Sequence, residues 1–214
     1  SRGLGDVYKR QAFKPLVDRI ADTDIRLQWF CCDRSTGVTD ASGNRITLIR
    51  DTQSPVAVEY QAVKFIGTGR DNIKAGVFSG WELGDYIYLR SEEAYMIKME
   101  ALAHKSSAEA VTELNSFMKT RQPDYNYTFT NKADLIEEII YQKRVEFWGE
   151  GLEYIDNRRL NIPVDRTDET WGAENNNHFS AGKFRYNQED RPFLYQLPLS
   201  EIENNSQLSP SDQN

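Results

Sequence analysis

The 214-residue chain has little of what carries redox chemistry, metal binding or membrane insertion. Its two cysteines are neighbours, Cys31 and Cys32, and a disulfide between adjacent residues is strained, so we expect two buried or half-buried thiols. The two histidines and two cysteines show no zinc-ligand spacing. No run of 18 apolar residues occurs, so the sequence predicts no membrane-spanning helix. We therefore assign no metal and no cofactor.

Basic residues are in the minority as well. The chain has 26 Lys and Arg against 33 Asp and Glu, a formal net charge of -7, which disfavours nucleic acid and anionic membrane surfaces as partners. Aromatic residues make up 12% of the chain, which argues against disorder and suits both cores and ligand platforms. The length is that of one domain or one large piece of a domain.

The N-terminal segment differs from the rest of the chain. The stretch from Asp6 to Gln11, DVYKRQ, resembles the translation of a sequencing-adaptor sequence. We therefore expect residues 1–11 to be a non-native segment that belongs to no fold. The natural protein would then begin upstream, and the lack of a signal peptide carries no information about localisation.

Three helices are predicted in the second half of the chain. Apolar residues recur at spacings of three and four over 86–104 and 108–121, and a third helix starts at Asn131, its expected N-cap. Ser106 and Ser107 form a break that caps the second helix. The residues expected on the apolar stripes are Leu89, Tyr95, Met96, Met99, Leu102 and Ala103, then Ala110, Val111, Leu114, Phe117 and Met118, then Leu135, Ile136, Ile139, Ile140, Phe147 and Trp148.

The other segments read as short elements and turns. Residues 12–28 start with a short helical pattern, 33–80 hold short β-type runs, and 193–205 predict a short strand followed by a turn. The two helices within 86–121 match one tetratricopeptide-type hairpin of about 34 residues. A single hairpin cannot bury its apolar face alone, so we expect a mostly α fold in which it stacks on other helices.

The stretch 137–159, EEIIYQKRVEFWGEGLEYIDNRR, is richer in Gly, Glu and Arg than a plain surface helix requires. Glu146 and Glu150 are one turn apart, but two carboxylates on one helix face rarely flank a cleft as glycoside hydrolysis demands. We expect them to make hydrogen bonds or ion pairs that fix the chain after the helix. Gly151 is expected to end the helix in a left-handed conformation or to permit close packing.

Three segments, in order, resemble the C-terminal part of the SusD/RagB family. They are YLRSEEAYMIKMEALAHK, which includes Arg90; the block at 142–159; and LYQLPLSEIENNSQLSP. Asp24-Ile25-Arg26 and Lys64-Phe65 also match short marks of the family. The chain departs from the family at Gln142, where Glu is usual, and at Ser206, where Pro is usual. The block residues that the family uses architecturally are Arg144, Glu146, Glu150, Gly151, Asp156 and Arg159.

The resemblance implies a fold and a function. Residues 12–214 would be the C-terminal part of a SusD-like domain, built from tetratricopeptide-like helical hairpins with long loops and a few short strands. Such proteins are outer-membrane, cell-surface lipoproteins of Bacteroidota-type bacteria, without catalytic activity. They capture oligosaccharide or polysaccharide and deliver it to a SusC-like, TonB-dependent porin. The lipid anchor would lie in the missing N-terminal part.

Tryptophans are the candidate sugar platforms, because the C–H face of a sugar stacks on a flat ring. Trp29 and Trp148 are expected in the core, whereas Trp81 and Trp171 lie in loop-like sequence and are the candidate ligand contacts. Three alternatives remain: peptide capture on the same scaffold, a glycoside hydrolase with two facing carboxylates, and an adaptor that binds only its porin.

Overall fold

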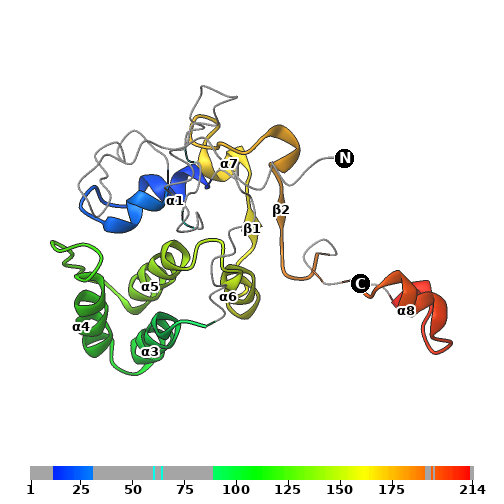
Figure 1. Cartoon of the computed structure of the whole chain (residues 1–214), viewed down its shortest axis with the longest axis horizontal. Coiled ribbons are helices and arrows are strands. Elements are labelled where there is room, and N and C mark those ends of the chain that lie inside the picture. Colours follow the sequence, from blue (N-terminus) through cyan, green and yellow to red (C-terminus); the bar gives the residue numbers. More distant parts are fainter. Residues whose placement is uncertain are drawn as a thin grey trace, which may run out of the picture. The chain divides into compact units, whose positions relative to one another are not determined.

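The computed structural model describes residues 12–30, 60, 64, 89–190, 194 and 196–212. The chain forms two compact units, one ending at Glu146 and the other beginning at Phe147. The described parts are mostly helical, as predicted (Figure 1). Residues 1–11, almost all of the segment 33–80 with its predicted β-type runs, the two cysteines and Trp81 lie outside the described residues. Within the described residues, no helix is long and apolar enough to cross a membrane.

The first unit opens with two short helices. Helix α1 is Lys14–Asp18, and the 3-10 helix η2 is Ile25–Trp29. Asp24 caps η2, because its carboxylate accepts a hydrogen bond of 2.8 Å from the Arg26 amide. Val17 and Phe30 are fully buried and anchor this segment in the core.

The predicted hairpin is present as α3, Ser91–Lys105, and α4, Ser107–Met118. Its buried apolar side chains are those of Met96, Met99, Ala103, Ala110, Leu114 and Met118, all on the predicted stripes. Two stripe residues were placed wrongly: Leu89 is 74% exposed because it precedes the helix, and Tyr95 is 51% exposed. Ser106 is the N-cap of α4, but its side chain makes no capping hydrogen bond.

Helix α5, Lys132–Glu146, packs against both helices of the hairpin, α3 and α4 (Figure 1). Asn131 caps it as predicted, because its side-chain oxygen accepts from the amides of Ala133 at 2.8 Å and Asp134 at 3.1 Å. Each fully buried aliphatic side chain of this helix, such as Leu135 or Ile139, contributes roughly 1.5–3 kcal/mol of transfer free energy. The helix ends at Glu146, so Phe147 and Trp148 lie beyond it, contrary to prediction.

The second unit contains short elements. These are α6, Leu152–Leu160; β1, Val164–Asp165; α7, Asp168–Trp171; η4, Ser180–Gly182; β2, Arg185–Tyr186; α8, Leu199–Asn204; and η6, Pro210–Asp212. Strands β1 and β2 pair antiparallel, with Val164 opposite Tyr186 and Asp165 opposite Arg185. A short strand followed by a turn was predicted over 193–205, but Leu199–Asn204 form α8, in which Pro198 is the N-cap residue and the good helix formers Leu199 and Glu201 follow.

Candidate functional site

A buried polar stripe runs along α5. Glu138, Gln142 and Glu146 follow each other at a spacing of four residues, so they share one helix face. They are only 7%, 4% and 1% exposed, respectively. Buried polar and charged groups need partners, so the stripe has to be matched by side chains from other segments.

Glu146 is surrounded by arginines. Its carboxylate accepts hydrogen bonds from Arg90 at 3.0 Å and from both Nε and Nη2 of Arg121 at 3.2 Å. The guanidinium of Arg26 lies 3.6 Å away. The backbone carbonyl of Glu146, at the C-terminal end of α5, accepts from Lys64 Nζ at 2.6 Å and from Arg90 at 2.9 Å. Cations are favoured at this end of a helix, where the last carbonyls lack helical partners.

Arg26 links the stripe to the N-terminal segment. It forms a forked pair with Asp24, with an Nη2–Oδ2 distance of 2.6 Å and an Nε–Oδ1 distance of 3.0 Å. It also donates to the side chain and the carbonyl of Gln142. The side chains of Arg26 and Asp24 are 1% and 3% exposed, so this ion pair is sealed from solvent.

The electrostatics keep Glu146 ionised. Burial alone would raise its pKa, but hydrogen bonds and charge from Arg121, a hydrogen bond from Arg90 and the charge of Arg26 bring the pKa below its ordinary value. An ionised carboxylate enclosed by three guanidinium groups and only 1% exposed has no proton to give and lies out of reach of a ligand. The geometry therefore supports the architectural role predicted for Glu146.

The other block residues lie around the start of the second unit. Glu150 is in the turn after α5, so it does not share a helix face with Glu146, and that prediction was wrong. Gly151 has the predicted left-handed backbone, with φ of 87°, but it precedes α6 and does not end α5. A Cβ there would meet nothing within 4 Å, so its backbone conformation, and not close packing, requires glycine.

Asp156 and Arg159 pair one turn apart on α6, with an Nε–Oδ1 distance of 2.8 Å. Asp156 is buried, whereas the Arg159 side chain is 39% exposed. Arg144 is half-buried on α5. These contacts support an architectural role, which stays a prediction for all six block residues.

Trp171 is the candidate ligand contact that the structure describes. It ends α7 and is 37% exposed, and its indole N–H donates to the carbonyl of Asp165 at 3.0 Å. The Asp165 carboxylate is itself fixed by the Thr167 amide at 3.0 Å, the Thr170 hydroxyl at 2.7 Å and Arg185 at 2.6 Å. The indole is thus held by its polar edge, which leaves its exposed surface suited to stacking.

The same contacts govern the charge of Asp165. Burial opposes ionisation, but hydrogen bonds from the Thr167 amide, the Thr170 and Thr167 hydroxyls and Arg185 lower its pKa to about 2. Asp165 therefore stays ionised at any pH at which the protein would work. Of the other tryptophans, Trp29 and Trp148 are half-buried, and Lys64 Nζ lies 4.7 Å from the Trp29 ring centroid.

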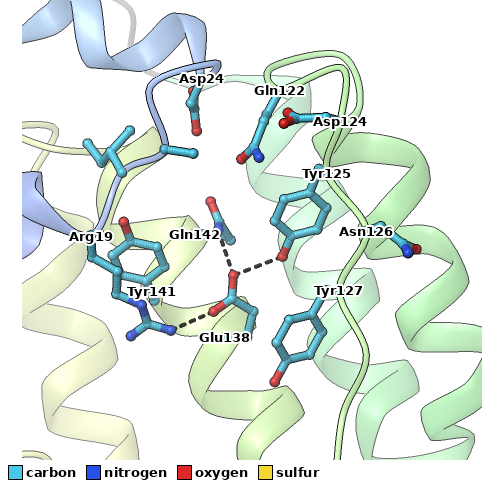
Figure 2. Close-up of a pocket in the computed structure, with 12 residues that line it drawn as sticks. Arg19, Asp24, Gln122, Asp124, Tyr125, Asn126, Tyr127, Glu138, Tyr141 and Gln142 are labelled. Carbon is cyan, nitrogen blue, oxygen red and sulfur yellow. Dashed lines mark hydrogen bonds and ion pairs between the residues drawn. The ribbon is translucent and has the colours of Figure 1, made fainter. Parts of the chain in front are cut away.

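A pocket of about 340 Å³ opens beside the other end of the polar stripe, within the first unit (Figure 2). Its lining is almost entirely polar or aromatic: Arg19, Ile20, Ala21, Asp24, Gln122, Asp124, Tyr125, Asn126, Tyr127, Glu138, Tyr141 and Gln142. Figure 2 shows Tyr125 and Tyr127 on one side, Arg19 and Tyr141 on the other, and Glu138 between them. Sequence reasoning did not single out this group.

Glu138 is the hub of the pocket. Its Oε1 accepts from the Tyr125 hydroxyl at 2.8 Å and from the Gln142 amide at 2.6 Å, and its Oε2 pairs with Arg19 at 2.5 Å. The Arg19 guanidinium also lies over the Tyr141 ring, 3.9 Å from its centroid. Burial and the Glu138 charge raise the pKa of Tyr125, so its hydroxyl remains a donor.

Tyr125 and Tyr127 form one side of the pocket, the tyrosine wall, and Asn115 fixes the backbone of this segment. Its amide donates to the Tyr127 carbonyl at 3.0 Å and its oxygen accepts from the Tyr127 amide at 2.7 Å. Tyr125 and Tyr127 alternate with Asn126 on an extended segment, so both rings turn to one side while Asn126 points away (Figure 2). That Tyr-Asn-Tyr alternation is the sequence signal that could have located the wall.

In the described part of the chain, no three or more His, Cys, Asp or Glu side chains are placed to hold a metal ion.

Comparison with known proteins identifies the family. The model of the SusD family matches residues 59–214. The crystal structure of a SusD-like carbohydrate-binding protein from Bacteroides vulgatus is similar to this chain over 90% of the chain, with 22% identity and a TM-score of 0.57. The chain spans 40% of the length of that protein. Among curated proteins, none matches. The family match covers well over half of the sequence, and the chain belongs to the SusD family.

Proposed function

We propose that the chain is the C-terminal part of a cell-surface glycan-binding protein that captures oligosaccharide or polysaccharide and delivers it to a TonB-dependent outer-membrane porin. The observation that carries the proposal is the family match over residues 59–214. The solved relative with a similar fold is a carbohydrate-binding protein, which supports the ligand class. Residues 12–214 form the SusD-like part, and residues 1–11 are the non-native segment.

The proposed chemistry of capture is non-covalent. Aromatic faces stack on the C–H face of a sugar, and neighbouring polar groups pair with its hydroxyls. Trp171 supports this proposal because its N–H is already bonded to Asp165, which orients the ring before any ligand arrives. Trp81 remains a proposed second contact.

A binding role without catalysis fits the surroundings of Glu138 and Glu146, the two buried glutamates of α5. A glycosidase acid needs a raised pKa and a carboxylate partner across a cleft. Glu146 has the opposite properties, since three arginines surround it and lower its pKa. Glu138 is engaged by Arg19, Tyr125 and Gln142.

The partner and the location complete the proposal. The intact protein sits at the outer-membrane surface through a lipid anchor upstream of this chain, with a SusC-like porin beneath it. Ligand affinity is shared between this chain and the upstream part, so glycan binding has to be measured on the intact protein.

A glycan array with the intact protein tests the proposal. Binding to at least one polysaccharide, weakened several-fold by Trp171→Ala, supports glycan capture. Exposed Tyr95→Ala is the matched aromatic control on α3 and leaves binding unchanged. Binding to peptides with none to glycans would replace the proposal by peptide capture, and binding to the porin alone would reduce the protein to an adaptor.

A further inference from the structure

We propose that the pocket around Glu138 is a subsite for one neutral sugar residue. This inference rests on the proposed glycan-binding function and deepens it, because it assigns a sugar contact in the first unit in addition to Trp171 in the second. The pocket volume of about 340 Å³ lies at the lower end of the roughly 300–1,000 Å³ usual for small-ligand sites. That size suits one or two sugar rings and not a folded peptide segment.

The pocket holds the mixture of groups that a polyol needs. Each sugar hydroxyl is both a donor and an acceptor, so it is best met by acceptors and donors side by side. Glu138 and Asp124 offer carboxylate oxygens, and the Arg19 guanidinium offers N–H donors. The Tyr127 hydroxyl donates to the Asp134 carbonyl at 3.0 Å, and its oxygen is left with acceptor capacity.

The Glu138 carboxylate is built to hold one more hydrogen bond. An ionised carboxylate offers about four acceptor sites. Tyr125, Gln142 and Arg19 fill three of them. The side chain is only 8% exposed, so a hydroxyl that reaches it from the pocket bonds to a charged acceptor sheltered from bulk water.

The charge of the lining selects a neutral ligand. Of the three carboxylates in the lining, Asp24 is paired with the buried Arg26 and Glu138 with Arg19, so the remaining charge of the lining is the negative charge of Asp124. A uronate would add a further negative charge beside Glu138 and Asp124 and would be repelled. A neutral sugar carries no charge and is not repelled. The Tyr127 ring gives its C–H face a surface to stack on.

The walls are preorganised. Asn115 clamps the backbone of Tyr127, and Glu138 and Arg19 are fixed to Tyr125 and Tyr141 before any ligand binds. A site whose side chains are already ordered loses little conformational entropy on binding.

The test measures binding of methyl glucoside and of methyl glucuronoside to the intact protein by NMR, with carbon-labelled tyrosine as the reporter. We expect the glucoside to shift the Tyr125 and Tyr127 ring signals and the glucuronoside to bind at least several-fold more weakly. Ala21→Phe fills the pocket without removing any of the side-chain hydrogen bonds described above. It should weaken glucoside binding about 10-fold, as expected for the loss of one or two hydrogen bonds.

Two further variants separate stacking from folding. Tyr127→Phe keeps the ring and retains glucoside binding within a few-fold, whereas Tyr127→Leu loses about 10-fold, equivalent to roughly 1.4 kcal/mol of stacking and packing. Tyr95→Leu, at an exposed tyrosine outside the pocket, is the control and changes neither affinity nor the pocket signals.

The outcomes distinguish this inference from the proposed function. If the intact protein binds polysaccharide on the array but Ala21→Phe leaves glucoside affinity unchanged, the subsite is wrong and glycan capture stands. If the tyrosine signals shift with glucoside but no polysaccharide binds, the subsite stands and glycan capture fails. Tighter binding of the glucuronoside than of the glucoside overturns the assignment to a neutral sugar.

Discussion

Helix α5 carries two buried glutamates, two turns apart, with opposite surroundings. Glu146 is closed in by Arg26, Arg90 and Arg121 and is 1% exposed. Glu138 pairs with Arg19, whose side chain is 46% exposed, and faces a pocket lined by tyrosines. The same residue type is thus enclosed by arginines at one end of the helix and borders a pocket at the other. The identity and exposure of the partners, and not the residue itself, separate architecture from recognition.

The largest effect is expected from Glu146→Ala. Removing this carboxylate leaves the Arg26, Arg90 and Arg121 guanidinium groups without their shared counter-ion in a buried site. Breaking a buried ion pair on one side costs about 3–5 kcal/mol of unfolding free energy. Chemical denaturation of the intact protein measures it.

The same helix offers the control. Glu137→Ala removes a carboxylate that is 78% exposed, and the free energy of unfolding should change by no more than about 0.5 kcal/mol. Equal losses from Glu146→Ala and Glu137→Ala would remove the distinction between buried and exposed charge on α5.

The pH dependence of the unfolding free energy tests the role of Glu146. Its pKa is lower in the folded state than its ordinary value of 4.5, so below pH 4.5 the unfolded state binds more protons and folding loses stability as the pH falls. The slope contributed by one proton reaches at most about 1.4 kcal/mol per pH unit. Glu146→Gln should flatten the acid side of the stability curve, and an unchanged slope would contradict the assignment.

Asn115→Ala probes the tyrosine wall. It removes both hydrogen bonds to the Tyr127 backbone and should lower the unfolding free energy by about 1–3 kcal/mol. It should also weaken glucoside binding, because the Tyr127 ring is no longer held. Normal binding in a destabilised variant would show that the clamp serves the fold alone.

Among the substitutions at buried positions, Glu138→Gln should have the smallest effect on stability, about 1 kcal/mol or less. Glutamine keeps an oxygen for the Tyr125 hydroxyl, and the lost ion pair involves a half-exposed Arg19, which limits its contribution. Glucoside affinity should nevertheless fall about 10-fold, since a charged acceptor is lost. A large loss of stability with intact glucoside binding would contradict the assignment of Glu138 to ligand binding.

The sequence predicted the scaffold better than the pocket. The helical hairpin, the Asn131 cap and the mostly α class follow from local spacing and capping chemistry. Arg26, Lys64 and Arg90 belong to three separate sequence segments that resemble the family. All three contact Glu146 in the folded chain, and residue spacing in the sequence cannot predict such a tertiary contact. The architectural role of Glu146 stays a prediction, which its three arginine partners support.

The pocket was missed for a physical reason. A charged residue such as Glu138, one turn from Gln142, reads as part of a solvated helix face unless its partners are known. Of those partners, Arg19 lies 119 residues away in the sequence, and Tyr125 lies 13 residues away, outside α5. Helix α8 was missed because Pro198 reads as a helix breaker, although proline is compatible with the start of a helix.

The most direct test compares glycan affinity in Glu138→Gln and Glu146→Gln, measured on the intact protein at a temperature where both variants and the parent are folded. We predict that Glu146→Gln binds the parent's preferred glycan with unchanged affinity despite its lower melting temperature. Glu138→Gln should bind it about 10-fold more weakly while melting close to the parent. The reverse pattern, with affinity lost in Glu146→Gln and kept in Glu138→Gln, would contradict the division of α5 into a scaffold end and a recognition end.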